Sequence, residues 1–158
     1  ATLRIVLDTN VLLAGLVSTR SASQMIVDAL NARRFIPLIS ADVLAEYRRI
    51  LAHPTVITRY PQLSSRTVAK VLHRLRYLGD EIKTSRVRFE FQRDPLDAKF
   101  IERAIAGDAT HIITLDDDLL SLATLPAEAG KRFRQRLPHV EVRRPGDFVS
   151  EFERHFTR

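Results

Sequence analysis

The chain has 158 residues, of which 45% are hydrophobic and 28% charged, and it contains no cysteine. This length and composition fit one globular domain, residues 1–158, and exclude disulfides and thiolate metal sites. The net charge of +6 is compatible with a polyanionic partner such as nucleic acid, and equally with ordinary solubility. No run approaches the roughly 20 apolar residues of a membrane-spanning helix, so we expect a cytoplasmic protein with no membrane partner.

The N-terminal half predicts strands that alternate with helices. The expected strands cover residues 3–7 and 35–39, and the expected helices cover about 23–32, 40–51 and 65–78. Residues 11–17 are apolar and either helical or irregular. Serines stand where helix N-caps are expected, at Ser21 or Ser23, at Ser40, and at Ser64 or Ser65. His53-Pro54 is expected to end the helix that begins at Ser40.

The C-terminal half continues this alternation. Residues 82–89 alternate weakly and predict an edge strand, and a helix capped at Asp94 runs to Gly107. Further strands are expected at 111–114 and 140–142, and further helices at 119–122 and from Pro145 through Phe156. Residues 126–138 form a basic, Pro-bounded insertion. The whole pattern predicts a three-layer α/β/α sandwich around a mainly parallel sheet.

Acidic side chains recur at the carboxyl ends of the expected strands or in the first two turns of the following helices: Asp8, Glu46, Asp97 and Asp116. Each has an ordinary alternative, such as helix capping for Asp8 or a solvated helix face for Glu46. In a parallel sheet, however, these positions share one edge, which is where open α/β sheets bind ligands. Crowded carboxylates destabilise one another, and a divalent cation relieves the repulsion. Because the donors are oxygens, Mg²⁺ or Mn²⁺ is favoured over zinc, and a water bound to such an ion attacks phosphodiesters.

The remaining polar residues of this region have two interpretations each. Asp-Pro-x-Asp at 94–97 places Asp94 at an N-cap and Asp97 at N3, which is also ordinary helix-start chemistry. Asp116, Asp117 and Asp118 open a short helix, where acids complement the helix dipole. Thr114 could cap locally or contact a ligand.

Three segments together resemble the PIN domain family. They are the strand followed by DTNV at 5–11, Glu46 in the second main helix, and DPLDAKFIERAIAGDATHIITLDDDLL at 94–120. The closest variety resembles the toxin components of bacterial toxin–antitoxin systems, and the likeness spans about residues 3–120. The resemblance implies a parallel-sheet α/β/α sandwich whose acidic edge binds Mg²⁺ or Mn²⁺ and cleaves RNA.

Carried over by position, the resemblance implies a core set of metal ligands and catalytic acids: Asp8, Glu46, Asp97 and Asp116. It also implies auxiliary acids at Asp94 and Asp118, and residues that orient acids or water at Asn10 and Thr114. Leu96 stands where an acid is common in this variety, so the site is slightly less acidic. A cognate antitoxin and a homodimer are the implied protein partners, and the 126–138 insertion receives no role.

Basic side chains suited to an RNA backbone occur in two groups, Arg66, Lys70 and Arg74, and Lys131 and Arg132. A solvated helix face explains either group equally well. The predicted function is a metal-dependent endoribonuclease, and the alternative is a non-catalytic RNA- or antitoxin-binding module with the same fold. A phospho-aspartate signalling domain is disfavoured, because the later strand ends lack the threonine and lysine that such a domain uses.

Overall fold

A computed structural model gives the fold, and residues 2–83, 87–91 and 98–153 are described below. The strands are β1 (Arg4–Leu7), β2 (Ile36–Ile39), β3 (Asp80–Glu81), β4 (His111–Ile113) and β5 (Glu141–Arg143). The helices are α1 (Thr9–Val17), α2 (Ala22–Asn31), α3 (Ala41–Leu51), α4 (Pro54–Arg59), α5 (Ser65–Leu78), α6 (Ala98–Ala106), α7 (Asp117–Leu122), α8 (Glu128–Arg136) and α9 (Pro145–Glu151).

The described strands form one parallel sheet in the order β3-β2-β1-β4-β5. From β1 the chain proceeds outward to β2 and β3, then returns across the sheet to β4 and continues to β5. Successive strands are therefore added first on one side of β1 and then, from β4 on, on its other side. The last residues of β1 and β4, Leu7 and Ile113, are register partners. This pair marks the topological switch point, where ligands bind in folds of this kind.

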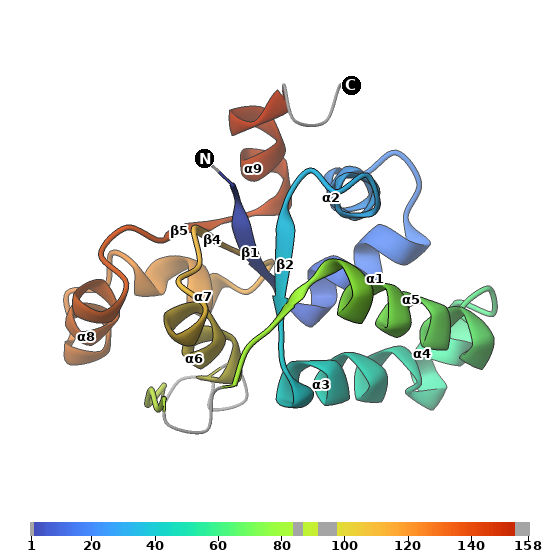
Figure 1. Cartoon of the computed structure of the whole chain (residues 1–158), viewed down its shortest axis with the longest axis horizontal. Coiled ribbons are helices and arrows are strands. Elements are labelled where there is room, and N and C mark those ends of the chain that lie inside the picture. Colours follow the sequence, from blue (N-terminus) through green and yellow to red (C-terminus); the bar gives the residue numbers. More distant parts are fainter. Residues whose placement is uncertain (1, 84–86, 92–97, 154–158) are drawn as a thin grey trace.

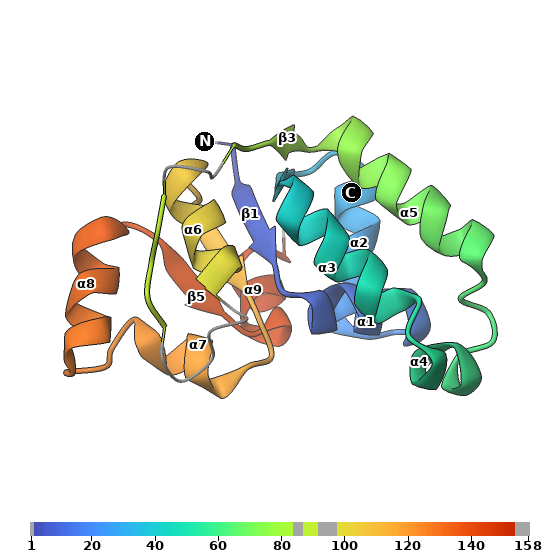
Figure 2. The same ribbon diagram turned by 90° about the horizontal axis from the view of Figure 1, so that it is seen from below.

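Helices cover both faces of the sheet. In two perpendicular views, α6, α7 and α8 lie on one side of β1, and α1, α2, α3 and α5 lie on the other (Figures 1 and 2). The central strands are buried between these layers, with Ile5, Val6 and Ile112 fully inaccessible to solvent. The predicted three-layer α/β/α sandwich with a parallel sheet is confirmed.

Three of the predicted serine caps are confirmed. Ser21 accepts the backbone N–H of Gln24, and Ser40 and Ser64 make the equivalent bonds at the starts of α3 and α5. The segment that follows β1 is the helix α1. Caps of this kind fix where each helix begins, and so they fix which residues reach the edge of the sheet.

The edge strand expected at 82–89 is wrong for the residues described there. The actual strand β3 is only Asp80–Glu81, and neither 82–83 nor 87–91 belongs to a strand. The alternation has another cause, because Phe89 and Phe91 are buried while Arg88 and Glu90 are exposed. Phe89 packs edge-on against Phe133 of α8 at 6.3 Å between ring centroids, so this segment lies against a helix rather than a strand.

Two helices were not expected from the sequence. Pro54 begins α4 at its first position instead of only ending α3, and the His53 ring accepts the N–H of Thr55 as the cap. The 126–138 insertion contains α8, which buries Phe133. The last described helix, α9, ends at Glu151, earlier than predicted.

Phe156 and the predicted start of α6 at Asp94 lie outside the described residues. In the described part of the chain, no helix has both the length and the apolar character that crossing a bilayer requires.

Candidate functional site

Asp8 occupies the switch point of the sheet, directly after β1. Its backbone N–H donates to the carbonyl of Ile113 at 2.9 Å, so β1 and β4 end side by side. The residue is only 5% exposed. Asp8 stands at the N-cap position of α1, where its side chain makes no capping hydrogen bond.

A chain of hydrogen bonds connects Asp8 to Asp116 through Thr114. The Thr114 hydroxyl donates to Oδ2 of Asp8 at 2.7 Å and accepts the backbone N–H of Asp116 at 2.9 Å. Asp116 Oδ1 accepts the backbone N–H of Asp118 at 2.9 Å and thereby caps α7. Because Thr114 is fully buried, it holds the two acids from neighbouring strands in a fixed relation.

The surroundings of Asp8 disfavour its negative charge. Burial is the largest influence and raises the pKa of Asp8, and the charge of Asp116 acts in the same direction. The Thr114 hydroxyl and the nearby amides of Thr9 and Asn10 lower this pKa without reversing the shift. A buried oxygen donor beside a second acid fits a hard divalent cation, which would stabilise the ionised form of both.

Glu46 lies in the second turn of α3, after β2, and is bound by two cations. Nη2 of Arg49 lies 2.9 Å from Oε1, and Nζ of Lys99 at the start of α6 lies 3.2 Å from Oε2. Burial acts to raise the pKa of Glu46, but the hydrogen bonds and charges of Arg49 and Lys99 outweigh it, so the pKa is lowered. Glu46 is therefore an ionised group that joins α3 to α6.

Lys99 is a site residue that was not identified from the sequence. The sequence feature that could have identified it is its position two residues after Asp97, because this position places a positive charge near the acids expected at this edge. Tyr47 is a further residue that was not identified from the sequence. Its buried hydroxyl donates to the carbonyl of Leu7 at 2.5 Å, next to Asp8. Burial and the charge of Asp8 raise the pKa of Tyr47, so this donor keeps its proton and anchors α3 at the end of β1.

Arg103 on α6 is another residue that sequence reasoning missed. It is fully buried, and its Nη2 donates to the Ser40 hydroxyl at the carboxyl end of β2 at 2.5 Å. Within the described residues, its Nε and Nη1 have no hydrogen-bond partner. Burial lowers the pKa of Arg103, while Tyr47 and nearby acids raise it. A positive charge thus lies behind the edge where the acids gather.

The other predicted acids are placed in part. Asp118 is half-buried in the first turn of α7, and Asn10 is exposed in the first turn of α1. Asp94 and Asp97 lie outside the described residues, so their roles stay predictions. The structure therefore brings Asp8, Thr114 and Asp116 into direct contact, with Glu46 on the helix after the neighbouring strand.

A pocket of about 650 Å³ opens on the same edge, beside the residues that follow β2 and β3. Its lining includes Ser40 and Asp42 on one side and Lys83 on the other, with Arg88 completing it. Arg88 lies 3.7 Å from Glu102 of α6, so its charge is partly compensated. Cations thus reach the sheet edge that carries the acids.

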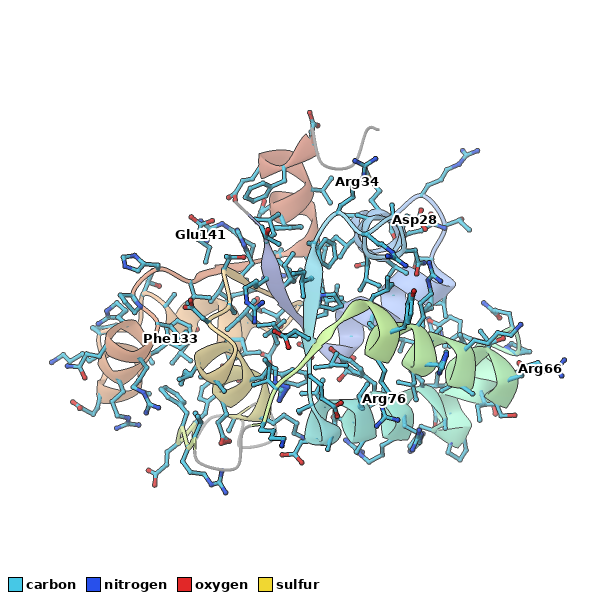
Figure 3. The ribbon with its side chains drawn as sticks, in the orientation of Figure 1. Asp28, Arg34, Arg66, Arg76, Phe133 and Glu141 are labelled. Carbon is cyan, nitrogen blue, oxygen red and sulfur yellow. The ribbon has the colours of Figure 1, made fainter. Side chains whose placement is uncertain are left out.

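The predicted RNA-binding residues lie on two helices, with Arg66, Lys70 and Arg74 on α5 and Lys131 and Arg132 on α8. These helices stand at opposite ends of the molecule, as the labels on Arg66 and on Phe133 of α8 show (Figures 1 and 3). Arg74 is engaged within the fold, because its Nε donates to Asn31 Oδ1 at 2.7 Å. Arg132 lies over the Phe89 ring at 6.0 Å. The two groups therefore form separate surfaces.

A parallel α/β sheet with linked acids at its switch point defines a class of proteins that bind a ligand at the carboxyl edge of the strands. A comparison with protein families shows which family of this class the chain belongs to. The profile of the PIN domain covers residues 4–118, and the chain therefore belongs to the PIN domain family. PIN domains are generally nucleases and usually use divalent metal ions, which places the chain among hydrolases at that coarse level.

The chain is also similar to the uncharacterized protein MJ1680 of Methanocaldococcus jannaschii. The two are 28% identical over 152 residues, which cover 96% of this chain and 93% of that protein. The similarity thus extends past residue 118 and includes α8, β5 and α9. No solved structure matches the chain.

Proposed function

We propose that the protein is an endoribonuclease that hydrolyses RNA phosphodiester bonds with Mg²⁺ or Mn²⁺. The observation that carries this proposal is the hydrogen-bonded chain from Asp8 through Thr114 to Asp116 at the switch point. A buried carboxylate with a raised pKa beside a second acid is costly as a purely structural feature, but it suits a cation site. Membership of the PIN domain family supports the same reading.

The residues proposed to hold the ion are Asp8, Glu46, Asp97 and Asp116, with Asp94 and Asp118 as auxiliaries. When bound, the ion polarises the phosphate and lowers the pKa of a bound water, which makes hydroxide available near neutral pH. The Thr114 hydroxyl holds Asp8 and Asp116 close to each other, and Lys99 sets the position of the Glu46 carboxylate. Asn10, exposed at the start of α1, is proposed to orient water or an acid.

For RNA, the proposed contacts begin in the pocket at the acidic edge, where Lys83 and Arg88 can neutralise phosphates. Lys131 and Arg132 are proposed as the next contacts, because α8 packs on α7, which begins at the candidate site. The α5 group lies at the other end of the molecule and is proposed to meet only a longer RNA.

We also propose that this single PIN-like domain is the toxin of a toxin–antitoxin pair, with an antitoxin and a second copy of the chain as partners. The support is the resemblance of about residues 3–120 to such toxins, carried by the strand and DTNV at 5–11, by Glu46 and by residues 94–120. Induction of the wild-type chain in bacteria is expected to arrest growth, and induction of Asp8→Asn is not. Equal growth in the two cultures would leave the nuclease proposal standing and remove the toxin role.

The experiment that tests the nuclease is cleavage of end-labelled RNA by the wild-type chain and Asp8→Asn. We expect metal-dependent cleavage by the wild type and a loss of about a hundredfold or more in the variant, because the substitution removes one charged ligand at constant shape. Asp117→Asn is the matched control. Asp117 belongs to the same acidic triplet, but its side chain is 85% exposed and pairs with Arg144, so cleavage should persist.

Folding must be checked in the same samples by urea unfolding. Burial raises the pKa of Asp8, so its ionisation removes stability as the pH rises from the ordinary carboxyl value through the raised folded value. Asn does not ionise, and Asp8→Asn should therefore be at least as stable as the wild type at pH 7. Cleavage by Asp8→Asn at the wild-type rate would refute the site. Tight RNA binding by the wild type in EDTA, with no product formed over hours in Mg²⁺, would instead establish the non-catalytic binding module.

A further inference from the structure

Three side chains with metal-binding atoms meet at the opposite edge of the sheet, where the strands begin. His111 begins β4, Glu141 begins β5, and Glu151 ends α9. One ligand atom from each lies within 4.8 Å of the others. His111 and Glu141 are register partners in the sheet, and Glu141 lies beside α9 (Figure 3). This group is separate from the candidate nuclease site, which lies at the carboxyl ends of the strands.

The hydrogen bonds of Thr110 hold the His111 ring in place. The Thr110 hydroxyl donates its hydrogen to the carbonyl of Arg4 at 3.0 Å, and the same oxygen accepts the N–H of Arg4. Nδ1 of His111 lies 2.9 Å from this oxygen. With the hydroxyl hydrogen on the Arg4 carbonyl, Nδ1 is the donor in this contact. In the neutral ring of that tautomer, Nε2 carries a lone pair.

Nε2 of His111 is buried and faces a carboxylate. The His111 side chain is 6% exposed. Its ring packs edge-on against the rings of Phe148 and Phe152, with 5.2 and 5.1 Å between ring centroids. Within the described residues, Nε2 has no hydrogen-bond partner, yet it lies 3.3 Å from Oε2 of Glu141. A cation between Nε2 and this carboxylate oxygen would bind both of them.

We propose that His111 Nε2 and the carboxylates of Glu141 and Glu151 bind a divalent transition-metal ion of the Zn²⁺ type. Mixed nitrogen and oxygen donors favour such an ion over Mg²⁺. Two ligands at about 2.1 Å from a tetrahedral ion lie about 3.4 Å apart, and the His111–Glu141 pair already has this spacing at 3.3 Å. Glu151, whose side chain is 38% exposed, can move inward to complete the set.

The second nitrogen of His111 supports the same assignment. Histidines that bind metals usually donate their other N–H to an oxygen, which fixes the ring and its tautomer. Nδ1 makes this bond to Thr110, whose hydroxyl is itself fixed by the backbone of Arg4. A metal here would join the end of α9 to the starts of β4 and β5, so its role is to stabilise the fold.

Arg143 is the competitor for this site. Its Nε lies 2.8 Å from Glu151 Oε1 and its Nη2 lies 3.5 Å from Glu141 Oε2, so its guanidinium compensates both acids when no metal is bound. The Arg143 side chain is one-third exposed and can swing into solvent. Removal of Arg143 should therefore tighten metal binding, whereas a site built only for an ion pair would gain nothing.

The test is calorimetric titration of the untagged chain with Zn²⁺ in excess Mg²⁺, together with Co²⁺ absorption spectra. We expect one zinc per chain, binding weakened by about tenfold or more in Glu141→Gln and Glu151→Gln, and tighter binding in Arg143→Gln. His111→Gln should abolish it, and the exposed glutamates keep the test valid if that variant fails to fold. His73→Gln, on the exposed face of α5, is the matched control and should leave zinc binding unchanged.

Asp8→Asn separates this proposal from the nuclease site, because zinc binding must survive in that variant. Zinc binding that disappears in Asp8→Asn but persists in Glu141→Gln would assign the ion to the other edge and overturn the proposal. The absence of stoichiometric zinc binding in both the wild type and Arg143→Gln would also overturn it, and would leave the nuclease proposal intact.

Discussion

Replacing Thr114 by valine tests whether its hydroxyl holds the candidate site together. Valine has nearly the same shape, so the change removes two hydrogen bonds without opening a cavity. One is the bond to the Asp8 carboxylate and the other is the bond from the Asp116 amide. A hydrogen bond to a charged group contributes about 1.5–3 kcal/mol and a neutral one about 1 kcal/mol, so the free energy of unfolding should fall by about 2–4 kcal/mol.

This loss should depend on pH in a direction that the structure fixes. The Thr114 hydroxyl lowers the pKa of Asp8, which means that it stabilises the ionised carboxylate. The difference between wild type and Thr114→Val should therefore be present at neutral pH and shrink as the pH falls through the pKa of Asp8. At pH 7 the expected decrease in Tm is roughly 5–15 °C for a chain of this length.

Urea unfolding at pH 7 and pH 4, with RNA cleavage measured in parallel, gives both quantities. Thr114→Ser keeps the hydroxyl and should restore cleavage and most of the stability. Thr124→Val is the matched control, because Thr124 is exposed and its hydroxyl makes only a 3.3 Å contact with a carbonyl. If Thr114→Val unfolds like the wild type and still cleaves RNA at the wild-type rate, the hydroxyl does not organise the site and the reasoning is refuted.

Two further predictions concern α8 and its basic face. Gly130→Ala would place a Cβ 2.0 Å from the carbonyl oxygen of Leu125, so we expect a loss of about 1–3 kcal/mol in urea unfolding. Gly146→Ala meets nothing within 4 Å and should stabilise by up to about 1 kcal/mol, and a reversed order would contradict the packing described. With a short RNA, Lys131→Gln should reduce the slope of log affinity against log salt by about 0.7, while Lys70→Gln leaves it unchanged. Equal slopes in both variants would exclude α8 as the RNA contact.

The fold could be predicted from the sequence because local signals agree with the final arrangement. Short apolar, β-branched runs marked β1 and β4, and the serines before α2, α3 and α5 marked the helix starts. The prediction failed at 82–89, where alternating burial of Phe89 and Phe91 comes from packing on α8. A period of two reports that one side of an extended segment is buried, and it does not say whether a strand or a helix does the burying.

Of the candidate site, only the acidic residues could be predicted from the sequence. Asp8 and Asp116 follow strands, and strand polarity alone brings such residues to one edge. The contacts that determine the site's charge come from elsewhere in the chain. Lys99 reaches Glu46 across 53 positions in sequence, and Arg103 reaches Ser40 across 63. Such partners depend on how α6 packs against α3 and β2, which no local pattern encodes.

The polarity of the sheet supports the proposal of different ions at its two edges. At the carboxyl edge, α1, α3 and α7 begin, and the positive ends of helices favour acids that can hold a hard cation. At the opposite edge helices end, so backbone carbonyls attract cations. Arg4 illustrates this, because its Nε donates to the carbonyl of Gly107 just after α6 at 2.9 Å. Arg143 ends β5 at the carboxyl edge, and its side chain reaches back to Glu151 at the end of α9. Its guanidinium compensates Glu141 and Glu151, whereas the proposed metal ion would also bind Nε2 of His111, which has no hydrogen-bond partner within the described residues.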